Sequence, residues 1–206
     1  MQQLLRIAAV AAALLPASLS AQTVIDEWAT IKTPPAPTLK TVKIEPGKTA
    51  LLVMDFVKQT CNAERRPRCV ASLPKMQKLI ADARKAGVTL IYTLGPSGKP
   101  DDHLPGFGPT AGEPILQAGV DKFIGTDLEK RLRDKGITTL ITVGTLAHGA
   151  VLYTASAAAL RGFKAIVPVD GASADAYGEQ VTAWLLTNAP GVAGSVTLTR
   201  VDMIGY

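Results

Sequence analysis

The feature that most constrains the fold is a repeated alternation of short apolar runs with helix-forming segments after residue 48. Continuous apolar runs are typical of strands buried on both faces, and they fall at 49–56, 88–94, 137–144, 163–170 and 195–204. Helices are expected from about residue 72 to Gly87 and over 126–136, 149–161 and 175–188. This alternation predicts an α/β fold, a three-layer Rossmann-like domain over residues 49–206 with a mostly parallel sheet of about six strands.

The first 21 residues have the pattern of a secretory signal peptide. Arg6 supplies a positive charge, residues 7–15 are apolar but too few to span a bilayer, and small residues follow up to Ala21. A membrane anchor or a buried helix is the alternative reading. We therefore expect export to a periplasmic or secreted location, with no membrane contact in the mature form. Residues 22–48 are polar and proline-rich, which favours an extended N-terminal arm.

The chain has two cysteines, Cys61 and Cys69, in "CNAERRPRC". In an oxidising compartment, two cysteines this close predict a disulfide. Such a bridge would stabilise the fold by about 2.6 kcal/mol in the chain-entropy model. A redox pair or a metal site is the alternative, but the spacing does not fit C-x-x-C and no paired histidines accompany it.

The net charge of +5 does not by itself indicate nucleic-acid binding. The densest basic run, "AERRPRC", has no interleaved aromatic residues. Its arginines Arg65, Arg66 and Arg68 are expected to splay outward as solvated surface charge, although they could instead steer an anion toward Asp55. No Gly-rich dinucleotide fingerprint or P-loop follows any predicted strand, so no cofactor is expected. A small molecule is the expected partner.

Three strand ends are informative about a site, namely those at Asp55, at the turn before the helix expected from residue 149, and at Asp170. Ligands of open parallel sheets bind beyond the carboxyl ends of the strands. Asp55 follows the first apolar run and suits proton transfer, although it could instead cap a loop or helix. Asp170 is expected to be structural. The loop at 95–114 is long and rich in Gly and Pro, which is typical of a functional lid.

The turn in "VGTLAHGAVLYTA", residues 143–155, is the second candidate element. Helix amides beginning near Gly149 favour an anion or a developing oxyanion. Ala150 occupies the position from which a nucleophile would profit most, and its methyl group is inert. Thr145, Leu146 and His148 complete the predicted substrate-binding turn, although His148 is equally explained by a hydrogen bond to the backbone.

Several of these segments resemble the isochorismatase-like cysteine hydrolases. The resemblance rests on Asp55, on "FIGTDL", on "AVLYTA" and on "ALRGFKAIVPVDGAS", and it spans residues 48–204. The family also includes nicotinamidases and N-carbamoyl amide hydrolases. The resemblance implies an isochorismatase-like fold, hydrolysis of a small molecule, and a homo-oligomer.

The typical site of that family combines an Asp, a Lys and a Cys. Asp55 matches the Asp, and Ala150 stands where the Cys belongs, so this member lacks the nucleophilic cysteine. Lys122 is the favoured match for the Lys, although it immediately precedes the phenylalanine of "FIGTDL". In the alternative the lysine is lost, and Gln117 or Gly119 stands near its place.

Isochorismatases proper also lack the cysteine and carry an "A-H" pair in this turn, as "TLAHGA" does here. In their reaction a protonated aspartate donates to a vinyl ether and water captures the resulting cation. Isochorismate itself is cytosolic, which does not fit an exported protein. Nicotinamidase-like relatives hold a metal with an Asp and two histidines. His103 and His148 are the only histidines here and lie in separate segments, so no metal is expected.

The sequence thus predicts an exported hydrolase that uses Asp55 for acid–base chemistry, with Lys122 orienting it or stabilising charge. The alternative is a non-catalytic small-molecule-binding protein on the same fold. An interaction module that uses the basic loop at 61–69 and the proline-rich arm is the weakest hypothesis.

Overall fold

The computed structural model describes residues 23–206, so the signal peptide predicted at residues 1–21 lies outside the described residues. The chain divides into two units, one up to Pro34 and one from Pro35 to Tyr206. The described part of the first unit holds a single helical turn, α1 (Val24–Glu27). The second unit begins earlier than the predicted boundary at residue 49. No helix among residues 23–206 is long and apolar enough to cross a membrane.

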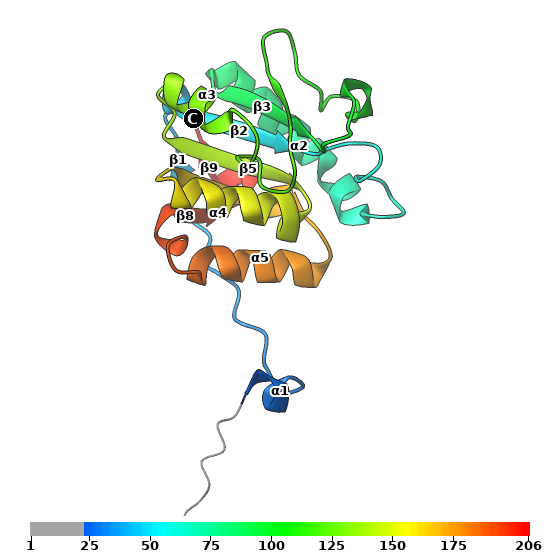
Figure 1. Cartoon of the computed structure of the whole chain (residues 1–206), viewed down its shortest axis with the longest axis vertical. Coiled ribbons are helices and arrows are strands. Elements are labelled where there is room, and N and C mark those ends of the chain that lie inside the picture. Colours follow the sequence, from blue (N-terminus) through cyan, green and yellow to red (C-terminus); the bar gives the residue numbers. More distant parts are fainter. Residues whose placement is uncertain (1–22) are drawn as a thin grey trace, which may run out of the picture. The chain divides into compact units, whose positions relative to one another are not determined.

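The second unit is built on a parallel sheet with the strand order β4-β3-β2-β5-β6-β8, in which a short β7 also pairs with β5 (Figure 1). Every pairing in the sheet is parallel. This confirms the predicted α/β fold with a mostly parallel sheet. The strands are β2 (Thr49–Met54), β3 (Thr89–Leu94), β4 (Ile115–Gln117), β5 (Thr139–Thr145), β6 (Lys164–Pro168), β7 (Ala172–Ser173) and β8 (Val196–Thr199).

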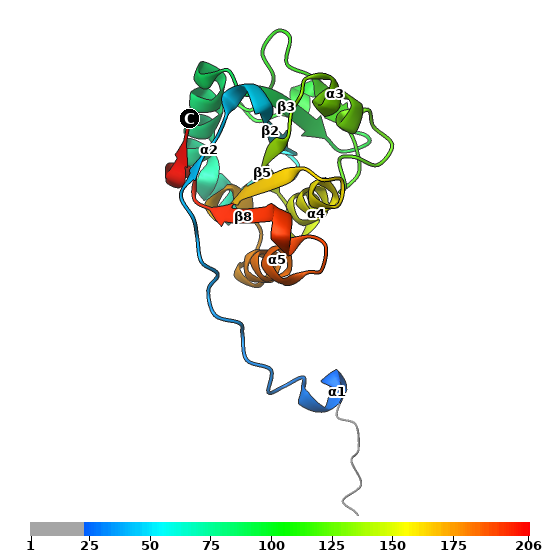
Figure 2. The ribbon, with the colours of Figure 1, turned by 90° about the vertical axis from the view of Figure 1, so that its left-hand side faces the viewer.

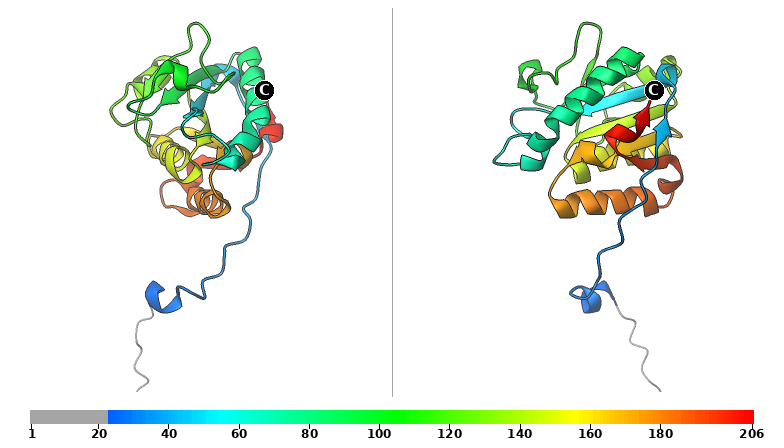
Figure 3. Two further views of the ribbon diagram at one scale, coloured as in Figure 1. Left: turned by 90° about the vertical axis from the view of Figure 1, so that its right-hand side faces the viewer. Right: turned by 180° about the vertical axis from the view of Figure 1, so that it is seen from behind.

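Helices cover both faces of the sheet (Figures 2 and 3). One face packs against α2 (Pro67–Ala86), and the other against α3 (Leu128–Asp134), α4 (Leu152–Leu160) and α5 (Ala176–Asn188). Strand β2 contributes side chains to the hydrophobic cores on both faces of the sheet. Leu51 and Val53 belong to the core under α2, and Leu52 and Met54 belong to the core under α3, α4 and α5. A small separate pair, β1 (Val42–Lys43) with β9 (Ile204–Gly205), joins the start of this unit to its end.

Several element boundaries differ from the sequence prediction for local reasons. Helix α2 begins at Pro67, five positions before the predicted start, because proline is preorganised for the first helical turn. The last apolar run is broken into β8 and β9 by a turn at Val201–Met203. The helix predicted from residue 149 starts at Leu152, after a π-helical turn over Ala147–Val151.

The strand order reverses between β2 and β5, because the chain runs from β2 outward to β4 and then returns to β5. Such a switch point leaves a crevice at the carboxyl ends of the two central strands. Asp55 follows β2 and the predicted substrate turn follows β5, so the topology brings these two segments together.

Gly144 lets these two strands approach closely, and Gly144→Ala is expected to destabilise the protein strongly. Gly144 pairs with Met54, and a Cβ atom there would lie 2.4 Å from the Met54 carbonyl oxygen. We expect the free energy of unfolding to fall by about 3 kcal/mol, at the upper end for overpacked sites, measured by denaturant titration. Gly47→Ala is the matched control, because nothing lies within 4 Å of a Cβ there. Equal stability of the two variants would contradict this account.

Candidate active site

The centre of the site is an ion pair between Asp55 and Lys122. Lys122 Nζ lies 2.7 Å from Asp55 Oδ2, and Thr93 Oγ1 donates to Asp55 Oδ1 over 2.7 Å. The Asp55 backbone is left-handed, with φ 58°, and its carbonyl oxygen accepts from the Val57 N–H and the Thr60 hydroxyl. The turn after β2 therefore fixes both the backbone and the carboxylate of Asp55.

Lys122 is buried beside Asp55, with a side chain that is 1% exposed against 16% for the aspartate. The segment that carries it is held on α4, because the Lys122 N–H donates to Thr154 Oγ1 and the Thr154 hydroxyl contacts the Val120 carbonyl oxygen. Gln117 instead donates to the Gly98 carbonyl oxygen. The structure thus brings Lys122, rather than Gln117, to the aspartate.

Thr126 and Glu129 have the spacing of a capping box that would start the helix expected over residues 126–136, but the structure forms no such box. Helix α3 begins one residue later, with Asp127 before its first residue, and Thr126 Oγ1 accepts from the Leu128 N–H while donating to the Lys122 carbonyl oxygen. Glu129 forms ion pairs with arginines instead. Thr126 therefore contributes to holding the Lys122 backbone.

A pocket of about 540 Å³ opens over Asp55 at the switch point. Four residues of the turn named in the sequence analysis line it, namely Thr145, Leu146, Gly149 and Ala150. The peptide bond between Thr145 and Leu146 is cis. Residues 95–98 and Asp102 of the long predicted lid also line the pocket, and Phe107 of the same loop stacks on Phe56.

The turn after β5 differs in detail from the predicted anion site. The Gly149 N–H donates to the Leu146 carbonyl oxygen over 3.1 Å, so this amide is engaged within the turn. Ala150 lies in the pocket wall and is 3% exposed. The methyl group of Ala150 can contact a substrate, but it cannot attack one as a nucleophile.

His148 is the one predicted substrate-binding residue that does not line the pocket. Its side chain is exposed, and its imidazole lies against Gly178 of α5, where an added Cβ would fall 2.2 Å from Nδ1. The glycine on α5 leaves room for the ring, which lies there rather than in the pocket wall. Across residues 23–206, no cluster of three His, Cys, Asp or Glu side chains is placed to hold a metal ion.

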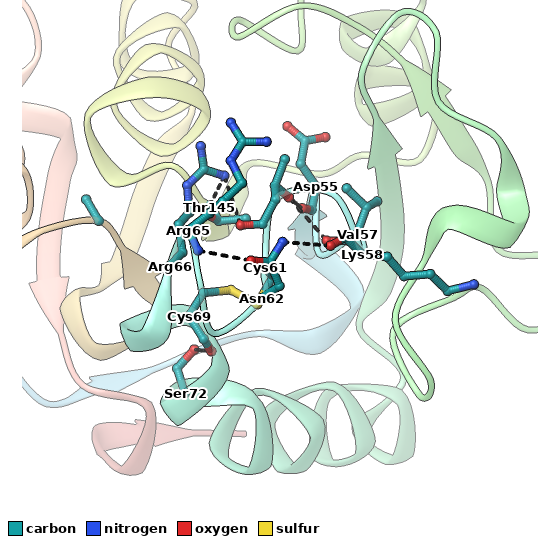
Figure 4. Close-up of a disulfide and its surroundings, with 12 residues drawn as sticks. Asp55, Val57, Lys58, Cys61, Asn62, Arg65, Arg66, Cys69, Ser72 and Thr145 are labelled. Carbon is teal, nitrogen blue, oxygen red and sulfur yellow. Dashed lines mark hydrogen bonds between the residues drawn. A yellow bond between two sulfur atoms is a disulfide. The ribbon is translucent and has the colours of Figure 1, made fainter.

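Cys61 and Cys69 form the predicted disulfide, which closes the basic loop beside the pocket (Figure 4). The expectation that the arginines of this loop all point into solvent is wrong for Arg66. Its guanidinium is half-buried, lines the pocket and donates to Thr145 Oγ1 over 3.2 Å. The sequence analysis considered this arginine only for steering an anion from the surface and did not place it in the pocket wall.

Removing the bridge by replacing both cysteines with serine is expected to lower the free energy of unfolding by about 2.6 kcal/mol. The reason is that the closed loop restricts the unfolded chain. Denaturant titration of the double variant against the oxidised wild type measures the loss, with reduced wild-type protein as a second reference. A double variant as stable as the oxidised protein would contradict this prediction.

A parallel α/β sheet with an Asp–Lys pair below a pocket at its switch point defines a class of small-molecule-binding domains. Residues 49–198 match the isochorismatase domain, and the chain therefore belongs to the isochorismatase family. Its fold is that of a cysteine hydrolase from Pseudomonas syringae pv. phaseolicola 1448A, with a TM-score of 0.68, 22% identity, and coverage of 81% of this chain and 95% of that one.

Two further structures show the same fold. An N-carbamoylsarcosine amidase from Thermoplasma acidophilum matches with a TM-score of 0.65 and 26% identity over 75% of this chain and 97% of that chain. An isochorismatase family protein from Desulfovibrio vulgaris subsp. vulgaris str. Hildenborough matches with a TM-score of 0.67 and 20% identity over 75% and 95% of the two chains. The predicted family and fold are thereby confirmed.

Proposed function

We propose that this protein is an exported hydrolase of small molecules that uses Asp55 for acid–base chemistry and has no cysteine nucleophile. The observation that carries the proposal is the Asp55–Lys122 pair at the pocket, opposite a turn in which Ala150 stands at the expected nucleophile position. Both cysteines of the chain are bonded to each other, which leaves no thiol to attack a substrate.

In this mechanism water attacks in place of a thiolate. With an ester or amide, Asp55 takes a proton from water while the water oxygen bonds to the carbonyl carbon. Asp55 then returns that proton to the leaving group as the bond between the leaving group and the carbonyl carbon breaks. With a vinyl ether, protonated Asp55 first donates its proton to carbon, and water adds to the resulting cation while giving a proton back to Asp55. The hemiketal so formed then breaks its C–O bond to release an alcohol and a carbonyl compound. In each case Lys122 stabilises the carboxylate form and Thr93 orients it.

Turnover on a panel of small esters, amides and vinyl ethers tests the proposal. We expect hydrolysis of at least one class by the oxidised protein, detected as product by mass spectrometry. A panel on which no substrate is consumed contradicts the hydrolase and leaves the second candidate.

The second candidate function is binding of a small molecule without turnover. It is favoured by the two short hydrogen bonds that already occupy both Asp55 carboxylate oxygens, and by the inert Ala150 side chain. Under this hypothesis a panel compound raises the melting temperature and is recovered unchanged. Under the hydrolase hypothesis the recovered material contains product.

Export is part of the proposal, and the disulfide supports it because such bridges persist in oxidising compartments. Intact mass of protein from the exported fraction tests it. We expect a mature chain cut near Ala21–Gln22 with both thiols bonded. An uncut chain with two free thiols would contradict export.

We also propose a homo-oligomer. Exposed apolar side chains on α4 and on the segment that packs beside it support this, namely those of Val120, Ile124, Tyr153 and Leu160. A second copy covering them would remove apolar surface from water. Light scattering measures the mass in solution, and a monomer at all concentrations contradicts the proposal.

A further inference from the structure

Arg66 has a fixed backbone and a side chain that reaches the pocket. The residue lies inside the loop closed by Cys61 and Cys69, its N–H donates to the Asn62 carbonyl oxygen, and Pro67 begins α2 directly after it. Figure 4 shows the Arg66 and Asp55 side chains directed to the same side of the bridged loop. The loop therefore presents a positioned cation beside the carboxylate of the proposed catalytic residue.

Arg66 is also a cation without an acidic partner. Most arginines of the described chain lie within ion-pair distance of a carboxylate, namely Arg68, Arg84, Arg131, Arg133, Arg161 and Arg200. Within residues 23–206, Arg65 and Arg66 are the exceptions, and of these two only Arg66 is half-buried and lines the pocket. Its guanidinium donates to the Thr145 hydroxyl and, over a longer distance, to the Thr60 carbonyl oxygen.

The acidic groups of the pocket are each engaged with other donors. Asp55 is paired with Lys122, and Asp102 accepts from Gln59 Nε2 and from the Lys99 N–H. The guanidinium of Arg66 thus lines the pocket without an ion pair to either of the pocket's carboxylates. Burial lowers the pKa of Arg66 and repulsion from Arg65 lowers it further, while attraction to the Asp55 carboxylate offsets part of this lowering. A partly desolvated cation of this kind gains most from an incoming anion.

We propose that the pocket takes a small carboxylic acid, whose carboxylate binds Arg66 and Thr145 while its reacting bond lies over Asp55. This inference rests on the proposed function, because it assigns the substrate class of the same site. A guanidinium matches the planar, two-oxygen geometry of a carboxylate. The Thr145 hydroxyl accepts from Arg66 and so keeps its own hydrogen for a ligand oxygen. A pocket of about 540 Å³ suits a small molecule.

Binding of matched neutral and anionic probes to the oxidised full chain tests this proposal. The probes are benzoate with benzamide, butyrate with butyramide, and inorganic phosphate, measured by calorimetry on wild type, Arg66→Gln and Arg65→Gln. Arg65 is the matched control, because it lies in the same loop, donates to the Gln59 carbonyl oxygen and does not line the pocket. Melting temperatures establish that all variants are folded.

We expect wild type and Arg65→Gln to bind one or both carboxylates at least about tenfold more tightly than the matching amides, and Arg66→Gln to lose that preference. Equal binding of acid and amide, no carboxylate binding at millimolar concentrations, or equal losses in both variants would overturn the proposal. Phosphate binding tighter than carboxylate binding would overturn the assigned class.

The same titrations on Asp55→Asn keep this inference separate from the proposed function. Carboxylate binding that depends on Arg66 in a protein without turnover supports the ligand class and contradicts only the hydrolase. Turnover of neutral panel substrates, with no effect of Arg66→Gln, supports the hydrolase and overturns the ligand class.

Discussion

Asp55→Asn is expected to lower turnover of any accepted panel substrate by about 10²–10⁴-fold, because the amide cannot move a proton between water and substrate. The backbone should tolerate the change, since asparagine adopts the left-handed conformation that Asp55 has here. Initial rates of product formation, measured at a temperature where the variant is folded, give the effect. The loss should fall on kcat more than on KM.

Asp102→Asn is the control for this prediction. Asp102 is the other carboxylate on the pocket wall, it is held by Gln59 and the Lys99 N–H, and it has no lysine ion pair. We expect it to retain most of the wild-type turnover. Full activity in Asp55→Asn, or equal losses in both variants, would remove Asp55 from the mechanism.

Lys122→Met is expected to reduce the free energy of unfolding by about 3 kcal/mol, because it leaves the Asp55 carboxylate without its counter-charge in a largely buried place. The double variant Asp55→Asn/Lys122→Met should recover most of that loss, since neither partner then carries an unpaired charge. Chemical denaturation of the four proteins of this cycle gives the coupling between the two residues.

Lys130→Met provides the matched control for the buried pair. Lys130 contacts Asp134 over 2.6 Å, a distance close to that of the Lys122 pair, but its side chain is 76% exposed. An exposed pair of this kind contributes between about 0 and 1 kcal/mol. Similar reductions in the free energy of unfolding for Lys122→Met and Lys130→Met would contradict the claim that burial strengthens the contribution of the Asp55 pair to stability.

The layered fold was predictable because strands buried on both faces must be apolar throughout. The run "TALLVM" gives β2, whose side chains serve two separate cores, and no other common element needs that pattern. Asp55 and Lys122 could also be predicted from the sequence. Asp55 directly follows this strand, and Lys122 directly precedes the "FIGTDL" segment that resembles the family. The end of β8 at Thr199 could not be predicted, because the following residues turn and then pair with β1, a strand from the other end of the domain.

The sequence did not predict the directions of side chains on turns. Arg66 and Arg65 are neighbours in the chain, yet one reaches Thr145 and the other stays outside, because the bridged loop and the start of α2 fix the backbone between them. His148 was placed in the pocket by its neighbours in sequence. Its ring lies against Gly178 of α5 instead, where the absence of a side chain leaves room for it. Such directions depend on tertiary contacts that a linear pattern does not contain.

The central claim is that hydrolysis proceeds without a thiol nucleophile, and alkylation tests it most directly. Oxidised protein from the exported fraction is treated with iodoacetamide, and its intact mass and its turnover of an accepted panel substrate are then measured together. The account predicts no added mass and unchanged turnover, because Cys61 and Cys69 are bonded to each other. Alkylation of either cysteine with a matching loss of turnover would contradict it.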